Sequence, residues 1–452
     1  MGCDSVQALV AQLDSFDAAV RRRALERLVE AIGAEGLGGR RPEVNLHCHT
    51  SLSYNAYGYS PTRFAWEARR YGLEVAGIVD FDVLDGVREF LEGGRLLKLK
   101  TVAGFETRVF VEELRDKVTN SPNEPGVSYL ITTGFAERPP PGSAAARTLT
   151  AMAERARRRN RELVARLNRH LEPVTLDYER DVLPLTPAGN ATERHMLVAL
   201  ERLAREVFPR PDRLVSFWSG KLNEPEAEVR RLLGDPVAFR SLVRLRLMKH
   251  GGVAYARPEE GSFPALEEVV GMTRDCGALP SGGWLDGTND GEEDPAVLFR
   301  FWLSRGIPTV TIIPDRNWNL KDSREKAAKV ANLREAVSAA SELEMPILVG
   351  TEMNADGQKL VDTFDAPELA SYGRAFLDGA HFAWGHTLLK MTAGVGAVGP
   401  WAEEHFGGDR AACNEFFRRV GSLPYPDEAT MDRLAEAGGG APPEAFLSVL
   451  EV

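Results

Sequence analysis

Two histidines stand two residues apart in the segment VNLHCHTS, at His47 and His49. The surrounding residues predict a strand, in which successive side chains face opposite ways, so both imidazoles share one face and Cys48 takes the other. Two imidazole nitrogens on one face can reach a single metal ion. Two hydrogen-bonded residues at a strand end would show the same spacing, and the pair alone leaves both interpretations open.

Carboxylates close other apolar runs later in the chain. Asp80 and Asp82 end AGIVDFD, Glu106 stands in TVAGFETRVF, and Glu352 stands in PILVGTEMN. A carboxylate in apolar surroundings costs several kcal/mol of stability unless it is paired, and a divalent cation would neutralise it. The alternatives are pairing with arginine and helix capping, for which aspartate is well suited.

The elements that must position these residues alternate between strand and helix. Seven apolar runs predict strands, several of them apolar on both faces as in a buried parallel sheet, and residues 278–287 are a further candidate. The seven runs are 44–50, 75–82, 101–111, 127–134, 253–258, 309–314 and 346–351. Helical patterns fall between most of them, at 62–71, 87–97, 265–275, 294–305 and 326–343. This rhythm is typical of α/β proteins, and the count favours a barrel over a doubly wound sheet.

Helical segments flank and interrupt the expected barrel. Residues 1–40 are expected to form an N-terminal extension of two short helices, ended by the glycine-rich stretch GAEGLGGRRPE. The barrel is expected over 41–391, with a helical insertion at 142–250 that is too long and too structured for a loop. Residues 392–452 are expected to form a helical C-terminal cap.

The composition is that of a folded protein, with 43% hydrophobic and 27% charged residues among 452. A formal charge of −11 argues against coating nucleic acid or an anionic membrane by bulk charge. No apolar run reaches the ~20 residues of a transmembrane helix, and the N-terminus does not read as a signal peptide. We therefore expect a cytoplasmic protein without a membrane partner. The four scattered cysteines predict neither disulfides nor a thiolate zinc site.

An arginine-rich helix, ERARRRNRELVARLNRH, is predicted at residues 154–170. Such a run can bind phosphates of RNA or DNA. Apolar residues at helical spacing along the same segment favour an amphipathic surface helix instead. A nucleic-acid partner is therefore not the favoured interpretation.

Four short motifs, taken in order, resemble one known family. HCHT after the first strand, GIVDFD closing the second, GFE closing the third and the late GTEMN are similar to motifs of the PHP family, the polymerase and histidinol phosphatase domain. The likeness spans residues 41 to 355. It implies a distorted TIM-like barrel of seven β/α units, whose strand ends hold up to three metal ions. The best-known members hydrolyse phosphoesters.

The resemblance also implies a ligand set for one metal ion. In the family, the first ion takes both histidines of the opening motif, the glutamate after the third strand and a late aspartate. The matching residues here are His47, His49, Glu106 and Glu352, the last longer than aspartate by one methylene.

The family's other ligand positions are occupied by different residue types, namely Tyr129, Arg257, Phe81, Asn55 and Asn354. Phenylalanine cannot bind a metal, and an arginine places a fixed positive charge where a second cation would lie. We therefore expect one divalent ion, which the ligand types suit as zinc, manganese or iron. Arg257 could hold a phosphate with two hydrogen bonds or form a salt bridge to Glu106 or Asp80.

Other residues are candidates for substrate binding and proton transfer. His195, next to Arg194 at a predicted helix start, resembles an arginine–histidine pair of the family, and the alternative is a partly exposed helix residue. Arg316 directly follows an apolar strand, where barrel enzymes gather functional groups, although it could instead pair with Asp315. We assign catalytic roles to Asp80, His195 and Arg257. Substrate binding is assigned to Arg194, Arg316, Tyr129 and Asn354.

The sequence therefore predicts a metal-dependent hydrolase of the PHP type. Its expected substrate is a small or nucleotide-like phosphoester, attacked by a water on a single metal ion. Two alternatives stay open. One is a PHP-like protein that has lost catalysis and binds an anion for regulation, because five expected ligands are replaced. The other is a mononuclear-metal isomerase or lyase acting on a sugar, because the same ligand types serve that chemistry.

Overall fold

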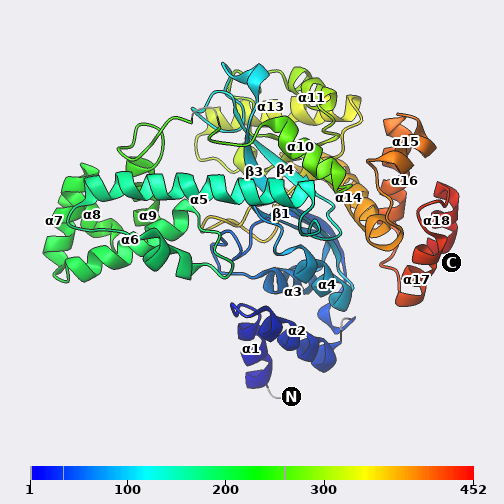
Figure 1. Cartoon of the computed structure of the whole chain (residues 1–452), viewed down its shortest axis with the longest axis horizontal. Helices are drawn as coiled ribbons and strands as arrows, with labels where there is room; N and C mark the ends of the chain where they lie inside the picture. The colour runs from blue at the N-terminus through cyan, green and yellow to red at the C-terminus, as the bar shows by residue number, and fades with distance from the viewer. Residues whose placement is uncertain (1–2, 34, 259–260, 452) are drawn as a thin grey trace. The chain divides into compact units, whose positions relative to one another are not determined.

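A computed structural model describes residues 3–33, 35–258 and 261–451 (Figure 1). It is an α/β protein with one seven-stranded sheet, in which the strands are neighbours in chain order. The sheet thus has the barrel-like order that the sequence predicts. The strands are β1 Arg41–Cys48, β2 Leu73–Phe81, β3 Lys100–Phe110, β4 Val127–Thr133, β5 Leu279–Trp284, β6 Thr309–Ile312 and β7 Ile347–Val349.

Backbone hydrogen bonds nearly close the sheet into a barrel, by joining β1 to the segment that follows β7. Glu352 N–H donates to the carbonyl oxygen of His47 at 2.7 Å, and His49 N–H donates to that of Glu352 at 2.8 Å. The close approach needs a glycine at position 350, since a Cβ there would lie 2.4 Å from the backbone nitrogen of His47. The closure thus places the late GTEMN motif beside the histidines.

Six of the strands run in one direction, and β4 runs in the other. It pairs antiparallel with both β3 and β5, whereas every other pairing in the sheet is parallel. The predicted alternation of strand and helix fails here, because a loop with only one short helical turn, at Glu112–Leu114, connects β3 to β4. A parallel pairing would need a longer crossover, usually a helix.

Five helices between the strands lie close to their predicted positions. They are α3 Pro61–Tyr71, α4 Val87–Leu97, α10 Leu266–Asp275, α11 Pro295–Ser304 and α13 Ser323–Glu342. The short helix α12 Asp315–Trp318 is not among the predicted helices. Two further helices precede β1, as expected from the sequence: α1 Cys3–Gln12 and α2 Ala18–Ile32.

The long helix α14 Gly373–Ala393 packs against the start of β7. A Cβ at Gly379 would lie 2.0 Å from the carbonyl oxygen of Ile347, the first residue of β7, so helix and strand are in direct backbone contact. Helix α14 therefore contacts β7 where that strand begins, whereas the histidine motif lies where β1 ends. Four helices follow α14: α15 Pro400–Phe406, α16 Arg410–Ser422, α17 Glu428–Ala437 and α18 Pro443–Leu450.

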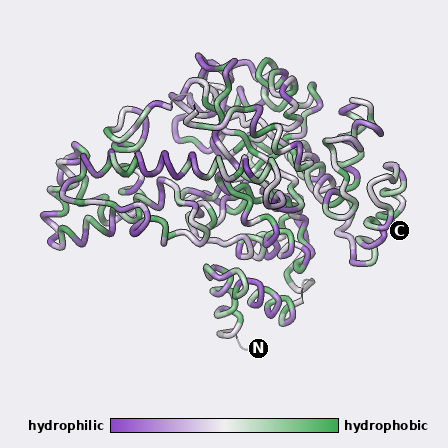
Figure 2. Tube along the Cα trace, viewed as in Figure 1, coloured by the Kyte–Doolittle hydropathy of each residue, from purple (hydrophilic) through white to green (hydrophobic). Residues whose placement is uncertain are grey.

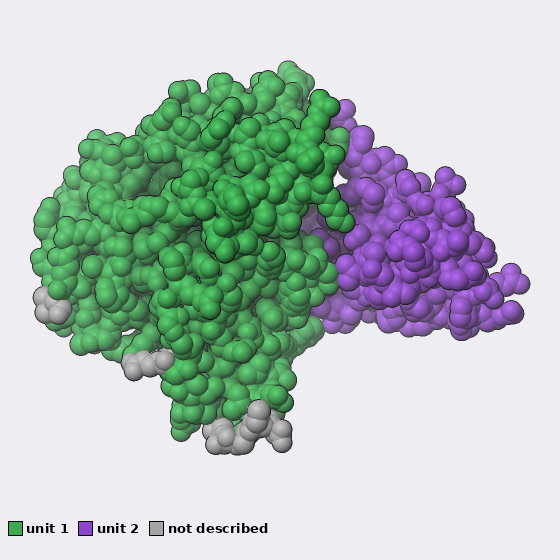
Figure 3. Space-filling model, turned by 180° about the vertical axis from the view of Figure 1, so that it is seen from behind, with its two compact units in different colours: residues 1–50, 55–149, 264–452 green, residues 51–54, 150–263 purple. Residues whose placement is uncertain are grey.

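The chain divides into two compact units (Figure 3). One comprises residues 1–50, 55–149 and 264–452 and holds the whole sheet, and the other comprises 51–54 and 150–263. The second unit has its own core, in which Trp218 and Phe239 are fully buried. Its helices are α5 Ala144–Leu171, which begins in the first unit, α6 Glu193–Val207, α7 Pro211–Leu222, α8 Glu226–Leu232 and α9 Pro236–Leu247.

The predicted strand at residues 253–258 is wrong, because the chain forms a turn and an irregular segment there. Ala254 N–H donates to the carbonyl oxygen of Leu247 at the end of α9, and Arg166 of α5 donates to the carbonyl oxygen of Ala254. The segment is therefore held by helices and not by a sheet. A short apolar run cannot distinguish the two environments.

The arginine-rich helix α5 is largely hydrophilic (Figure 2). Arg159 donates to the carbonyl oxygen of Ser262 and lies over the ring of Phe263, and Arg161 pairs with Glu179. These arginines therefore make contacts within the second unit. Among the described helices, none has both the length and the apolar character that crossing a bilayer requires.

Candidate metal centre

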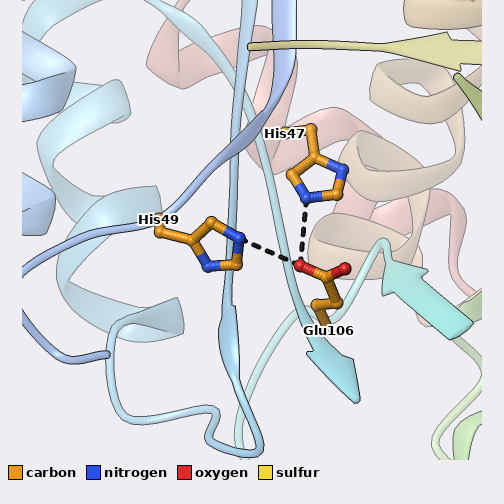
Figure 4. Close-up of side chains that lie close together, drawn as sticks. All are labelled: His47, His49 and Glu106. Atoms are coloured by element: carbon orange, nitrogen blue, oxygen red, sulfur yellow. Dashed lines mark hydrogen bonds and ion pairs between the residues drawn. The ribbon is translucent and has the colours of Figure 1, made fainter. Parts of the chain in front are cut away.

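His47, His49 and Glu106 converge inside the sheet unit (Figure 4). Nε2 of His47 lies 3.2 Å and Nε2 of His49 lies 2.9 Å from the same carboxylate oxygen of Glu106. All three side chains are buried, with 3%, 0% and 6% of their surfaces exposed. The ligand atoms of the three residues lie within 4.8 Å of one another. His47 near the end of β1 and His49 directly after it therefore share one face, as the sequence predicts, and both imidazoles reach one carboxylate oxygen.

Neighbouring strands bring the glutamate to the histidines. The parallel sheet places β2 between β1 and β3, and Glu106 is the register partner of Phe81 at the end of β2. The intervening Cys48 of β1 contacts Met353 through sulfur and is not part of the cluster. Burial and the charge of Asp80 raise the pKa of the Cys48 thiol well above its usual value, so this sulfur stays protonated.

The electrostatics of the cluster call for a cation. Burial acts to raise the pKa of Glu106, but the charges and hydrogen bonds of His47 and His49 outweigh it and lower this pKa to about 2. An ionised buried carboxylate needs a positive partner, either an imidazolium or a metal ion. Two imidazoles and a carboxylate form a donor set that suits zinc, manganese or iron. A metal ion held by these three side chains would keep a coordination position for a water or substrate, as in catalytic zinc sites.

Asp80 is the last residue but one of β2, and both of its carboxylate oxygens accept from Thr50, the residue that follows His49. The backbone N–H and the hydroxyl of Thr50 donate to the two carboxylate oxygens of Asp80, both at 2.7 Å. Asp80 therefore fixes the end of the histidine motif. Its role in proton transfer stays a prediction. Sequence reasoning missed Thr50, although its place directly after HCH puts a hydroxyl beside the centre.

The backbone of Glu352 is hydrogen-bonded to His47 and His49, but its carboxylate is hydrogen-bonded to Arg316 and Gln358. Nη2 of Arg316 donates to both of its oxygens, at 2.9 and 2.7 Å, and Nε2 of Gln358 donates to one of them at 2.8 Å. Burial raises the pKa of Glu352, and the charges of Arg316 and His47 bring it below its usual value. Glu352 is not in the three-residue cluster, and its role as a fourth ligand stays a prediction.

The backbone is strained at two strand ends that flank the centre. Glu352 and Met353 have φ of +63° and +53°, and Asp82 after β2 has φ of +59°. Residues other than glycine adopt this left-handed conformation at a cost of about 1–3 kcal/mol each, and such residues cluster at functional sites. The strain is held by hydrogen bonds: Asp82 N–H donates to the carbonyl oxygen of Glu106, and Thr107 donates to the carboxylate of Asp82.

Aromatic residues and an asparagine hold the histidine strand. The ring of Phe81 stacks on His49 with centroids 4.2 Å apart, and the ring of Tyr129 lies 6.4 Å from that of Phe81. Asn45 is fully buried, accepts from His47 N–H and donates to the hydroxyl of Thr351 beyond β7. Sequence reasoning missed Asn45, whose signal is the alternation of polar residues at 45, 47 and 49. Asn354, half-buried after β7, and Tyr129 remain predicted substrate contacts.

Three predicted site residues, Arg194, His195 and Arg257, belong to the second unit. His195 is buried in the first turn of α6, where its Nδ1 accepts from Thr192 N–H at 3.1 Å, and burial lowers its pKa to about 4. It is thus a neutral residue that caps the helix. Arg194 lies over the ring of Tyr54, and Arg257 is exposed in an irregular segment. Their catalytic and binding roles stay predictions.

Comparison with known proteins finds no similar sequence family, and the similar solved structures share few identical residues with this chain. No family model matches the sequence, so the resemblance to the PHP family remains a prediction, and no curated protein matches. An amidohydrolase from Chromobacterium violaceum, solved with sulfate and no metal, is similar over 70% of this chain and 88% of its own, at 14% identity and a TM-score of 0.46. A protein from Bifidobacterium adolescentis, proposed to be a metal-dependent phosphoesterase, is similar over 74% and 96%, at 15% identity and a TM-score of 0.45.

Proposed function

We propose that this protein is a metal-dependent hydrolase that binds one divalent ion through His47, His49 and Glu106 and cleaves a small phosphoester. The observation that carries the proposal is the buried convergence of two imidazoles on one carboxylate oxygen of Glu106. A divalent ion bound there polarises a phosphoryl oxygen and lowers the pKa of a coordinated water. His47, His49 and Glu106 would hold the ion, and three protein ligands would leave room for a water or substrate oxygen.

The protein's own residues supply the surroundings of the reaction. Asp80 and Thr50 hold the end of β1 so that both imidazoles stay directed at Glu106. Arg316, in the short helix α12 after β6, carries the positive charge that an anionic substrate needs, because its guanidinium can pair with phosphate oxygens. Whole-chain charge cannot attract such a substrate, since the formal charge is −11. A local cationic site therefore has to do so.

Elemental analysis of the purified protein tests the metal site. We expect about one equivalent of zinc, manganese or iron in the native protein, and none after His47→Ala combined with His49→Ala. Glu106→Gln, which preserves the shape of the side chain, should lose the metal as well. His250→Ala, which removes an exposed histidine of the second unit, is the matched control. Equal metal content in all four proteins, each checked for folding by circular dichroism, would rule out the site.

Activity assays then distinguish the reaction types. The metal-loaded protein is expected to hydrolyse a phosphate monoester or diester such as a nitrophenyl phosphate, and Glu106→Gln should lower the rate by more than about 100-fold. Turnover of amide or sugar substrates in place of phosphoesters would contradict the phosphoesterase assignment. Phosphate binding without any turnover would favour the regulatory alternative, a protein that binds an anion and has lost catalysis.

A further inference from the structure

Arg316 and Glu352 form a pair that belongs to the centre but is separate from the three metal-binding side chains. Arg316 lies in α12, directly after β6, and Glu352 lies directly after β7, which is the parallel neighbour of β6. The two residues therefore meet at the same edge of the sheet as His47. The backbone of Glu352 is hydrogen-bonded to His47 and His49, so the Arg316–Glu352 pair lies beside the histidine motif.

The carboxylate of Glu352 is already fully engaged. It accepts two hydrogen bonds from Nη2 of Arg316 and one from Gln358, whose own side-chain oxygen accepts from Ala355 N–H. The left-handed backbone at Glu352 and its backbone bonds to His47 and His49 hold the side chain in place. A carboxylate held in this way is set up to position a guanidinium, and moving it to a metal ion would break three hydrogen bonds.

Arg316, by contrast, has unused donors. Only Nη2 makes hydrogen bonds, so within the described part of the chain Nε and Nη1 have no partner. Its side chain is 46% exposed, whereas that of Glu352 is 10% exposed. Nη1 keeps two N–H groups that can donate to an oxygen of a phosphoryl group, and Nε keeps one more on a different edge of the guanidinium. The buried side of Arg316 is thus anchored and its other side can receive an anion.

We propose that Glu352 is a positioning residue for Arg316, not a metal ligand, and that Arg316 binds the phosphoryl group of the substrate beside an ion held by three ligands. The inference rests on the proposed function and assigns the group that binds the phosphoryl part of its substrate. If both histidines are neutral, a divalent ion and Arg316 carry three positive charges, and Glu106 and Glu352 carry two negative charges. The site then has a net charge of +1, which favours an anion. Without Arg316 the net charge is zero.

This inference opposes the ligand set that the sequence resemblance implies. If Glu352 turned to the ion as a fourth ligand, its loss would weaken metal binding as much as the loss of Glu106 does. If Glu352 holds Arg316, its loss would leave metal binding intact and weaken anion binding. Metal affinity and phosphate affinity, measured separately, therefore distinguish the two arrangements without any assay of turnover.

Calorimetric titrations provide both quantities, first with Mn²⁺ or Zn²⁺ and then with inorganic phosphate on the metal-saturated protein. We expect Glu352→Gln to keep the metal affinity within about threefold of the native value and to weaken phosphate binding about 10- to 100-fold. Arg316→Gln should do the same, and the double variant should bind phosphate no more weakly than Arg316→Gln alone, because the two residues act as a unit. Arg316→Lys should recover part of the affinity through its charge.

Arg324→Gln, an exposed arginine on α13, is the control and should change neither affinity. A loss of metal affinity in Glu352→Gln as large as that in Glu106→Gln would overturn the inference and make Glu352 a ligand. Native phosphate affinity in Arg316→Gln would overturn it as well. A native protein that binds no metal would instead overturn the proposed function and this inference with it, so the two failures are distinguishable.

Discussion

The imidazole of His49 is stacked on the ring of Phe81, with the two planes inclined by only 19° and the centroids 4.2 Å apart. Phe81 ends β2, beside β1, which contains His47 and ends at Cys48 directly before His49. Aromatic contacts of this kind contribute about 0.5–1.5 kcal/mol beyond the burial of area, and they fix the plane of the ring. A residue type that cannot bind a metal therefore orients one that can.

Phe81→Leu should weaken metal binding about tenfold, because residues that orient a ligand typically contribute at least this much to metal affinity. Leucine keeps the apolar contact but loses the flat ring that holds the imidazole. The dissociation constant for Zn²⁺, measured by competition with a chelating dye, is the readout. Phe364→Leu, a half-buried phenylalanine of the same unit that contacts Phe376, should leave it unchanged. Equal affinities in both variants would show that the stacking is incidental.

Gly350→Ala should disrupt the closure of the barrel. The added methyl carbon would lie 2.4 Å from the nitrogen and 2.6 Å from the Cβ of His47, and backbone atoms cannot move aside as a flexible side chain can. We expect a loss of about 3 kcal/mol in the free energy of unfolding, together with weaker metal binding. Urea titrations measure the first quantity, and Zn²⁺ titrations measure the second.

The matched substitution is Gly271→Ala in α10, where a Cβ would meet nothing within 4 Å. Alanine favours the helix over glycine by up to about 1 kcal/mol, so this variant should be as stable as the native protein or slightly more. A Gly350→Ala variant that is equally stable would mean that β1 and β7 are not held together as closely as the hydrogen bonds indicate.

Much of the sheet could be predicted because its strands are buried on both faces. Apolar runs therefore located β1, β2, β3, β4, β6 and β7 to within a few residues. The direction of β4 could not be found in the same way, since it depends on the connection and not on the strand. The run at 253–258 failed because helices, not a sheet, bury Ala254.

The centre shows the same division between local and tertiary information. The two-residue spacing of His47 and His49 places both side chains on one face, and this can be predicted from the local sequence. The position of Glu106 beside them can be predicted once β1, β2 and β3 are taken as neighbours in a parallel sheet. The pairing of Glu352 with Arg316 could not be predicted in this way. The two residues are 36 positions apart, and they meet only once the loops after β6 and β7 have folded. Sequence alone left arginine pairing and metal binding as alternatives for such carboxylates.

A buried histidine at the other end of the sheet should destabilise the protein in acid. His386 of α14 donates from Nε2 to the carbonyl oxygen of Gly134 and accepts at Nδ1 from Ala397 N–H, so both nitrogens are used by the neutral ring. Burial lowers the pKa of His386 from 6.5 to about 3. Because the folded state resists protonation, this contribution to stability is complete above pH 6.5 and is lost as the pH falls toward 3.

His386→Gln should reduce this acid sensitivity, since the glutamine amide can also donate to one carbonyl and accept from one N–H. Between pH 7 and pH 4.5 the native protein is expected to lose about 3 kcal/mol more of its free energy of unfolding than the variant does. Urea titrations at several pH values measure the difference. Parallel pH profiles for the two proteins would show that His386 titrates normally in the fold.

Glu292 should produce the opposite dependence. It is fully buried in the loop after β5, where its carboxylate accepts from Leu285 N–H at 2.8 Å. Burial, with the charge of Asp286, raises its pKa from 4.5 to about 7, against the effect of the backbone hydrogen bonds. The folded state therefore keeps a proton that the unfolded state releases. Stability from this group is complete below pH 4.5 and is lost as the pH rises through 7.

Glu292→Gln replaces the carboxyl by an uncharged group of the same shape and should remove this loss. We expect the variant to match the native protein near pH 4 and to exceed its free energy of unfolding by about 3 kcal/mol at pH 8. Glu293→Gln, at the neighbouring exposed position, should leave the profile unchanged. A native protein as stable at pH 8 as the Glu292→Gln variant would mean that Glu292 ionises in the fold, with Lys329, which pairs with Asp286, compensating its charge.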